Sequence, residues 1–326
     1  DEIDRLSQEA GKCESCGTSN VPLIEANALA DKFELVCGIY EPNDDGKQLI
    51  DWLINDWKLF RVERAQAMIL LGDILDNAER VRQSYSPSEL CASDTLDVWE
   101  LLRDELLTQN RFFPKTEFNK DRVGGLLEHL RMPPEEIPHQ WYRARIEDGG
   151  GPYPSEKMGA PPPRHAAPGR ANPVGIPYLY VGSELATAVT EVRPHPGEIL
   201  TVAEVAVEEG IQLIDLRVPR EMITPFVMAD IEEVAAMRGD IDFLERLGHE
   251  LTTPVLPNAA AVEYIPSQYL CEFIKQVGYD GVVYASSVSE GINLAFFMPD
   301  KATVGATKRV IIDRVDVNFG EHTGED

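Results

Sequence analysis

Apolar residues in the first third of the chain recur at helical spacing. Leu49, Leu53, Trp57 and Phe60 fall at i, i+4, i+8 and i+11, which is one stripe of a helix. Two further helices are predicted over residues 62–81 and 93–107. Residues 45 to about 130 therefore predict a mainly helical region.

The apolar pattern changes to short runs in the second half of the chain. These runs predict strands over residues 177–181, 199–207, 211–216, 281–285, 293–297 and 309–317. One clear helix lies among them, with Leu270, Phe273, Ile274 and Val277 on one face and Gly278 as its stop. The irregular alternation indicates an α+β fold with a mixed or antiparallel sheet, and not repeated βαβ units.

Two segments rich in proline and glycine separate these regions. Residues 132–140 have the charged, Pro-rich composition of a linker. Residues 147–175 consist mostly of Gly, Pro and small residues, so neither a helix nor a central strand is expected there. A loop of this length is usually functional or disordered. We predict a helical N-terminal domain over 1–135 and a second domain over 136–326.

The chain is strongly acidic, with 30 Lys and Arg residues against 56 Asp and Glu residues and a net charge of −26. Such a chain repels phosphate backbones, which argues against nucleic acid as a ligand, and an acidic surface suits either solubility or a basic protein partner. No apolar run is long enough for a membrane span, and the first residues do not resemble a signal peptide. Five cysteines, an odd and sparse set, suggest a reducing cytoplasm.

Several common catalytic motifs are absent from the sequence. There is no GxGxxG between a strand and a helix and no GxxxxGK[ST], so neither a Rossmann site nor a P-loop is indicated. HExxH and GxSxG are also missing. A nucleotide-binding enzyme with this sequence must bind its ligand by another design.

A set of dispersed segments in the second half carries a more specific signal. The segments are WYRAR (141–145), MGAPPP (158–163), GRANPVGIPYLY (169–180), TAVTEVRP (187–194), IPSQYLCEFIKQVGYDGVVYASS (265–287) and NLAFF (293–297). In this order and spacing they resemble the RES domain, which is named for an Arg, a Glu and a Ser. The resemblance covers roughly residues 138–300. The preceding helical region, with its CxxC, is similar to the HEPN- or RES-associated N-terminal domain.

The resemblance implies an ADP-ribosyltransferase-like fold that acts on NAD. Arg143 matches the Arg of the family, Glu191 its Glu and Ser286 its Ser, while Arg170 matches a second Arg and Tyr180 a pocket Tyr. We expect Glu191, Arg143, Ser286 and Tyr180 to be catalytic. The residues expected to bind NAD are Arg143, Arg170, Tyr178, Tyr180, Ser286 and Asn293.

Two details of this assignment stay open in the sequence. Ala285 stands where the family often has Pro, and the neighbouring Ser287 leaves the identity of the active hydroxyl undecided. The sequence also does not show whether Tyr178 or Tyr180 faces the pocket.

These residue types suit cleavage of the nicotinamide-ribose bond of NAD. A fixed carboxylate stabilises the oxocarbenium character that develops at the ribose, and an Arg fork suits the pyrophosphate. NAD is then the substrate, and no further cofactor is required. Water or phosphate is the preferred acceptor. The alternatives are an ADP-ribosyltransferase that modifies a protein or small molecule, and a non-catalytic NAD or ADP-ribose adaptor.

The resemblance also implies a toxin-antitoxin system. Several members of the family are bacterial toxins that deplete NAD and are neutralised by a DNA-binding antitoxin. A cytoplasmic toxin of this kind needs such a partner, and the acidic surface suits a basic one. We expect residues 136–326 to be at least as toxic alone as the whole chain.

Two weaker signals lie in the N-terminal region. Cys13, Cys16 and Cys37 are candidate zinc ligands, but a tetrahedral site needs four, so we expect no metal. Arg122 and His129 form an Rx6H pattern that resembles HEPN ribonucleases. Val123 replaces the polar residue that usually follows that Arg, and a solvated helix end is the preferred interpretation.

Overall fold

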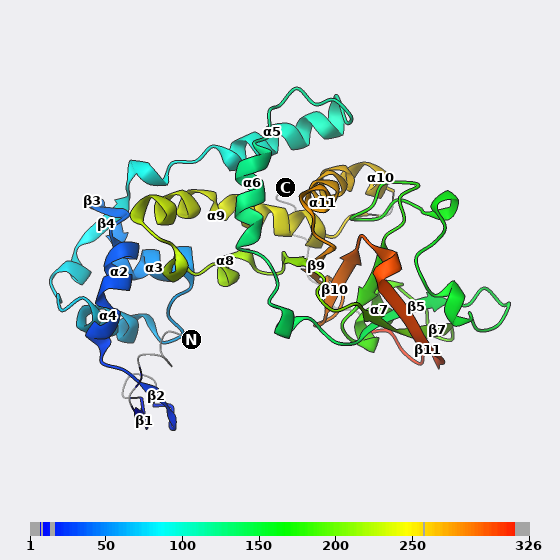
Figure 1. The fold of residues 1–326 in the computed structure, drawn as a ribbon, viewed down its shortest axis with the longest axis horizontal. Helices are drawn as coiled ribbons and strands as arrows, with labels where there is room; N and C mark the ends of the chain where they lie inside the picture. The colour runs from blue at the N-terminus through cyan, green and yellow to red at the C-terminus, as the bar shows by residue number, and fades with distance from the viewer. Residues whose placement is uncertain (1–6, 8, 14–16, 257, 317–326) are drawn as a thin grey trace. The chain divides into compact units, whose positions relative to one another are not determined.

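The computed structural model describes residues 7, 9–13, 17–256 and 258–316 (Figure 1). By its contacts the chain divides into two compact units. Unit 1 combines residues 1–101 with 218–246, and unit 2 combines residues 102–217 with 247–326. The units are defined by packing alone, and the linear boundary predicted after residue 135 stays a prediction. None of the described helices is both long and apolar enough to cross a lipid bilayer.

Unit 1 is mainly helical and contains two small antiparallel sheets, β1–β2 and β3–β4. Its elements in chain order are β1 (Glu9–Gly11), β2 (Val21–Leu23), η1 (Ala26–Leu29), α2 (Ala30–Cys37), β3 (Tyr40–Gln48), α3 (Leu49–Trp57), α4 (Arg64–Ile74), η2 (Arg80–Arg82), β4 (Ser84–Pro87), η3 (Glu89–Cys91), the start of α5 (Thr95–Thr108), α8 (Pro219–Met222), η7 (Pro225–Val227) and most of α9 (Ile231–Thr252).

The predicted helical stripe is largely confirmed in α3. Leu49 and Leu53 are fully buried and Trp57 nearly so. Phe60 lies beyond the helix, because Lys58 adopts a left-handed conformation (φ 52°) that ends it. The prediction of helix from residue 45 is wrong for the first residues, since β3 continues to Gln48. That strand is polar along most of its length and gives no alternating apolar signal.

Unit 2 is built on a seven-stranded mixed sheet in the order β11-β7-β5-β6-β10-β9-β8. All neighbouring strands are antiparallel except β8 and β9. Its elements are the end of α5, α6 (Lys120–Glu128), η4 (Pro134–Glu136), β5 (Trp141–Ile146), η5 (Ser155–Lys157), η6 (Pro163–His165), β6 (Leu179–Gly182), α7 (Leu185–Glu191), β7 (Ile199–Val207), β8 (Leu213–Asp215), the end of α9, α10 (Ala260–Glu263), α11 (Ile265–Val277), β9 (Gly281–Ala285), β10 (Ile292–Phe296), η8 (Pro299–Lys301) and β11 (Ala302–Ile311).

The α+β class and the mixed sheet are confirmed, with one strand misplaced. Five predicted strands match β6, β7, β8, β9 and β10 closely. The strand expected over 309–317 is wrong in its bounds, because β11 starts at Ala302 and ends at Ile311. The loop over 147–175 contains only the short turns η5 and η6, as its Gly and Pro content predicts.

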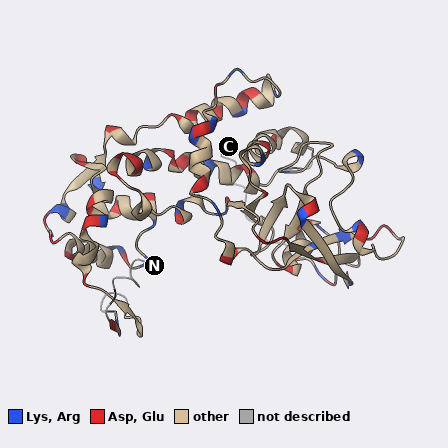
Figure 2. Ribbon diagram, in the orientation of Figure 1, with Lys and Arg blue, Asp and Glu red and all other residues tan. Residues whose placement is uncertain are grey.

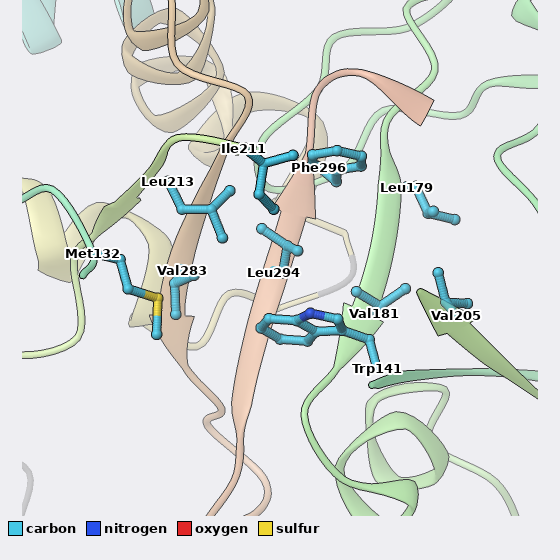
Figure 3. Close-up of a cluster of buried hydrophobic side chains, with 10 residues drawn as sticks. All are labelled: Met132, Trp141, Leu179, Val181, Val205, Ile211, Leu213, Val283, Leu294 and Phe296. Carbon is cyan, nitrogen blue, oxygen red and sulfur yellow. The ribbon is translucent and has the colours of Figure 1, made fainter. Parts of the chain in front are cut away.

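The sheet of unit 2 is packed on both faces. One face carries the apolar cluster of Figure 3: Met132, Trp141, Leu179, Val181, Val205, Ile211, Leu213, Val283, Leu294 and Phe296. The other face carries Ala144, Leu200 and Val202, against which Ala188 of α7 packs. Each fully buried large apolar side chain contributes about 1.5–3 kcal/mol relative to exposure. The two-sided packing makes the central strands a rigid support for side chains at their ends.

Helix α11 follows its predicted pattern except at its last residue. Leu270 and Ile274 are buried, and Gly278 ends the helix with φ 115°, as expected for a glycine stop. The expectation that Val277 shares the buried face is wrong, since that side chain is 43% exposed.

Candidate active site

Glu191 is the last residue of α7, a helix that lies close against the sheet. A Cβ on Gly291 would lie 2.0 Å from Thr187 Oγ1, so only glycine permits this approach. Glu191 Oε1 accepts a hydrogen bond from Ser286 Oγ at 2.7 Å and another from Asn293 Nδ2 at 2.5 Å. Three of the predicted residues, far apart in the sequence, therefore meet at one carboxylate oxygen.

The structure distinguishes the two adjacent serines. Ser286 directly follows β9, its hydroxyl donates to Glu191, and its Oγ also accepts from the backbone N–H of Val288 at 3.2 Å. Ser287 is exposed and makes no hydrogen bond within the part of the chain that the structure describes. Ser286 is thus the hydroxyl that belongs to the carboxylate group.

Arg143 lies on β5, where that strand separates from β6. The two strands pair only at Tyr142 and Gly182. Beyond that point Arg143 Nη1 donates to the backbone oxygen of Tyr180 at 3.4 Å, while its Nε is buried without a partner among the described residues. Burial lowers the pKa of Arg143 to about 10, with a smaller contribution from the charge of Arg145. An anion bound here would relieve this desolvation.

Tyr180 is fixed by the segment that carries Arg170. Its hydroxyl donates to Asn172 Oδ1 at 2.7 Å and accepts from the backbone N–H of Ala171 at 3.0 Å. A Cβ on Gly169 would lie 2.6 Å from this hydroxyl, which explains the glycine before Arg170. Sequence reasoning did not single out Asn172, because an isolated Asn beside Pro looks like a turn residue.

Arg170 is held from the opposite side by the segment before and within α11. Its Nη1 donates to the backbone oxygen of Thr253 at 2.7 Å, and its guanidinium carbon lies 5.3 Å from the ring centre of Tyr264. The backbone oxygen of Arg170 accepts from Ser267 Oγ at 2.5 Å. No hydrogen bond or ion pair among the described residues joins Arg170 to Arg143 or Glu191.

Tyr178 has a different environment from Tyr180. It is 2% exposed, and its ring lies 4.7 Å from that of Phe297, centre to centre. Its hydroxyl is buried without a partner among the described residues. Burial raises the pKa of Tyr178 well above its ordinary value. The structure therefore places Tyr178 in the packing of the domain, and Tyr180 in the hydrogen-bonded network beside Arg170.

A further tyrosine, Tyr284, belongs to this region and was missed by sequence reasoning. It is 5% exposed and pairs directly with Asn293 across β9 and β10. Burial raises its pKa well above the ordinary value, Tyr180 and Glu191 raise it further, and Arg170 opposes them. Tyr284 thus experiences the charges of both Glu191 and Arg170. In the sequence it resembles any aromatic strand residue.

The weaker candidates in the N-terminal region gain no support. No three His, Cys, Asp or Glu side chains in the described ranges are arranged to hold a metal. Cys37 is buried, which raises its thiol pKa to about 12 and disfavours the thiolate that zinc requires. Cys16 lies outside the described residues, so zinc at the CxxC stays a prediction.

The Arg122 and His129 pair lies on α6 and at its end. Arg122 is exposed on α6, and His129 is the residue at which that helix ends. Val123, next to Arg122, is fully buried. The ribonuclease interpretation stays a prediction.

Comparison with known proteins identifies the second half of the chain. A family model described as the RES domain matches residues 140–317, more than half of the 326 residues. No curated protein matches the chain. Among solved structures, a chain from the crystal structure of the M. tuberculosis MbcT–MbcA toxin-antitoxin complex is similar, with 12% identity and a TM-score of 0.34. That alignment covers 57% of this chain and 92% of the other. On the strength of the family match, this chain belongs to the RES domain family.

Proposed function

We propose that this protein cleaves the bond between nicotinamide and ribose in NAD. The observation that carries the proposal is the Glu191 carboxylate, which Ser286 and Asn293 hold at one oxygen. Hydrogen bonds from two fixed donors hold such a carboxylate in one orientation before substrate arrives. A preorganised negative charge is what an oxocarbenium-like transition state requires.

The proposed reaction balances without a cofactor. The bond between C1 of the nicotinamide ribose and the pyridinium nitrogen breaks, and its electron pair neutralises the nitrogen, so nicotinamide leaves uncharged. Water then attacks the ribose carbon and loses a proton, which gives ADP-ribose. With phosphate as the nucleophile the product is ADP-ribose 1''-phosphate. The second oxygen of Glu191 is available to stabilise the developing charge or hold a ribose hydroxyl.

The arginines supply the complementary charge for the pyrophosphate. Arg143 is desolvated and its Nε has no partner among the described residues, while Arg170 is oriented by Thr253. Acidic side chains are spread over both units (Figure 2), yet residues 140–200 hold six Lys or Arg and six Asp or Glu. This segment is thus electrically balanced in a chain of net charge −26, which reduces the repulsion of an anionic substrate.

We also propose that the protein acts as a toxin that depletes NAD and is restrained by an antitoxin. Membership of the RES domain family supports this proposal. The acidic net charge favours a basic partner such as a DNA-binding antitoxin, because complementary charge speeds association. The presence of both Glu191 and Arg143 favours an enzyme over a non-catalytic NAD-binding adaptor.

The test is incubation of the full chain with NAD, followed by mass spectrometry of the products. We expect nicotinamide together with ADP-ribose, or with ADP-ribose 1''-phosphate when phosphate is present. A mass increase of ADP-ribose on an added protein would instead indicate transfer to that protein. Intact NAD after prolonged incubation with the folded chain would contradict the proposed cleavage.

A further inference from the structure

Tyr284 is a buried side chain near Glu191 that has no role in the reaction proposed above. It stands directly opposite Asn293 in the antiparallel pair of β9 and β10. Residues opposite each other in such a pair point to the same face, with Cβ atoms about 5 Å apart. Since Asn293 Nδ2 lies 2.5 Å from Glu191 Oε1, this register brings Tyr284 beside the carboxylate group.

The hydroxyl of Tyr284 has no hydrogen-bond partner among the residues that the structure describes. It makes no hydrogen bond to any residue in the described part of the chain, although the side chain is only 5% exposed. The fully enclosed side-chain atoms without a partner belong to Ser88, Trp141, Arg143 and Tyr178, and Tyr284 is not among them. Its hydroxyl is therefore unpaired among the described residues and is not fully enclosed. Buried polar groups are nearly always paired, so an unpaired one that is not fully enclosed suits a ligand.

The surroundings of Tyr284 favour a neutral aromatic ligand over an anionic one. Tyr180, Glu191 and Cys271 all disfavour negative charge at Tyr284, and Arg170 opposes them with a smaller effect than that of Glu191. Tyr284 itself stays protonated at neutral pH and can donate a hydrogen bond. A carboxylate placed here would be partly desolvated and repelled by Glu191. A carboxamide would accept a hydrogen bond from the Tyr284 hydroxyl and, because it is neutral, would not be repelled by Glu191.

We propose that Tyr284 donates its hydroxyl to the carboxamide oxygen of nicotinamide, and so makes the site selective for NAD over its nicotinate analogue. This inference rests on the proposed NAD cleavage. In the proposed reaction the nicotinamide ring leaves the ribose carbon whose developing charge Glu191 stabilises. The ring must therefore lie beside the Glu191 carboxylate. Tyrosine rings also suit a pyridinium, because their faces attract a cation. The pyrophosphate of NAD, in contrast, requires the positive charges of Arg143 and Arg170.

The test compares Tyr284→Phe with the parent and with Tyr279→Phe. Tyr279 is a matched control, since it is also a buried tyrosine of unit 2 but lies near Glu128 and Arg131. Loss of one neutral hydrogen bond corresponds to roughly threefold to tenfold in binding. In Tyr284→Phe we expect KM for NAD and the inhibition constant of nicotinamide to rise by about that factor. The inhibition constant of ADP-ribose should stay constant, and Tyr279→Phe should match the parent in every constant.

A second measurement compares two substrates, NAD and its nicotinate analogue. The parent should process NAD with kcat/KM at least about tenfold above that for the nicotinate analogue, and Tyr284→Phe should narrow this ratio. Unchanged nicotinamide inhibition in a folded Tyr284→Phe, or equal use of both dinucleotides by the parent, would overturn the inference while leaving NAD cleavage intact. Failure of the parent to cleave NAD at all would instead overturn the proposed function, and this inference with it.

Discussion

Asn293 Nδ2 lies 2.5 Å from Glu191 Oε1 and so joins central strand β10 to the last residue of helix α7. Asn293 is 5% exposed, and its strand is paired on both sides, with β6 and with β9. The carboxylate at the exposed end of a short helix is thereby fixed by the most rigid part of the sheet. This relationship gives Glu191 a defined position without any bound substrate, which is the condition for electrostatic catalysis.

Glu191→Gln should abolish most NAD turnover. The Gln side chain keeps the shape and an oxygen that can accept from Ser286 and Asn293, but it removes the charge. Loss of a preorganised charge usually lowers kcat by on the order of a hundredfold or more, while NAD affinity should change much less. Steady-state kinetics and calorimetry measure the two effects. Glu184→Gln is the control, because Glu184 is exposed at the other end of α7. Parent-like turnover in Glu191→Gln would rule out this mechanism.

Asn293→Asp should lower activity more than Asn293→Ala does. The substitution sets a second carboxylate against Glu191, and like charges at this distance repel each other. The repulsion should move the Glu191 carboxylate away from β10, whereas Asn293→Ala only removes one hydrogen-bond donor. We expect kcat/KM for NAD to be about tenfold or more lower in Asn293→Asp than in Asn293→Ala, which corresponds to about 1.4 kcal/mol in the barrier. Steady-state kinetics of the two folded variants measure this difference. An equal loss in both variants would count against direct charge repulsion at Glu191.

Arg143→Met should raise the stability of the ligand-free protein. Arg143 is desolvated, and its buried Nε has no partner in the described part of the chain, so its charge costs folding free energy that an anionic ligand would offset. An apolar side chain of similar length removes this cost. We expect the Tm to rise by roughly 2 °C, which corresponds to about 1 kcal/mol in a chain of this size. NAD should then no longer raise the Tm further.

Arg145 provides the matched control on the same strand. Its Nη1 donates to the backbone oxygen of Lys157 at 2.7 Å, and its guanidinium carbon lies 4.3 Å from the ring centre of Tyr153. Arg145→Met should therefore lower the Tm, because it removes contacts that fasten the long loop. Thermal melts with and without NAD measure both variants. A lower Tm in Arg143→Met would show that Arg143 is satisfied in the free protein.

The sequence identified the residues of the carboxylate group but not their contacts. Glu191, Ser286 and Asn293 lie in motifs whose order resembles a family, so they could be named without any structure. The choice of Ser286 over Ser287 depends on how the chain turns after β9, which neighbouring serines do not encode separately. Tyr284 and Asn172 were missed because a strand aromatic and a loop Asn acquire their roles only from their spatial neighbours.

The packing partner of a segment is equally hidden in the sequence. Periodicity shows which face of a helix is buried, but not which part of the chain covers it. Val218–Arg246 lies within the matched RES domain range, yet it packs with residues 1–101 in unit 1. The pattern of apolar residues along the sequence does not show that residues 218–246 pack with residues 1–101.

Because residues 218–246 pack with residues 1–101, the fragment 136–326 expressed alone loses the partners of that segment. In the full chain Arg220 donates to the backbone oxygen of Asn55 at 3.2 Å, and Arg238 Nε lies 3.0 Å from Asp56 Oδ2. The ring of Phe226 lies 5.1 Å from that of Phe33, centre to centre. The fragment lacks Phe33, Asn55 and Asp56, so it exposes apolar surface, removes the carboxylate partner of Arg238 and removes two backbone acceptors of Arg220, which costs several kcal/mol.

We therefore expect this fragment to be poorly soluble and to cleave less NAD than the full chain, in contrast to the autonomous toxicity that the sequence suggested. Asp56→Ala in the full chain should weaken the same packing without removing any domain, because it leaves Arg238 and Arg220 without this carboxylate. We expect a loss of about 3 kcal/mol in unfolding free energy, the usual scale for breaking a buried ion pair. Denaturant unfolding, fragment solubility and NAD consumption measure these effects. A soluble fragment with full NAD cleavage would show that the RES domain folds and acts without the N-terminal region.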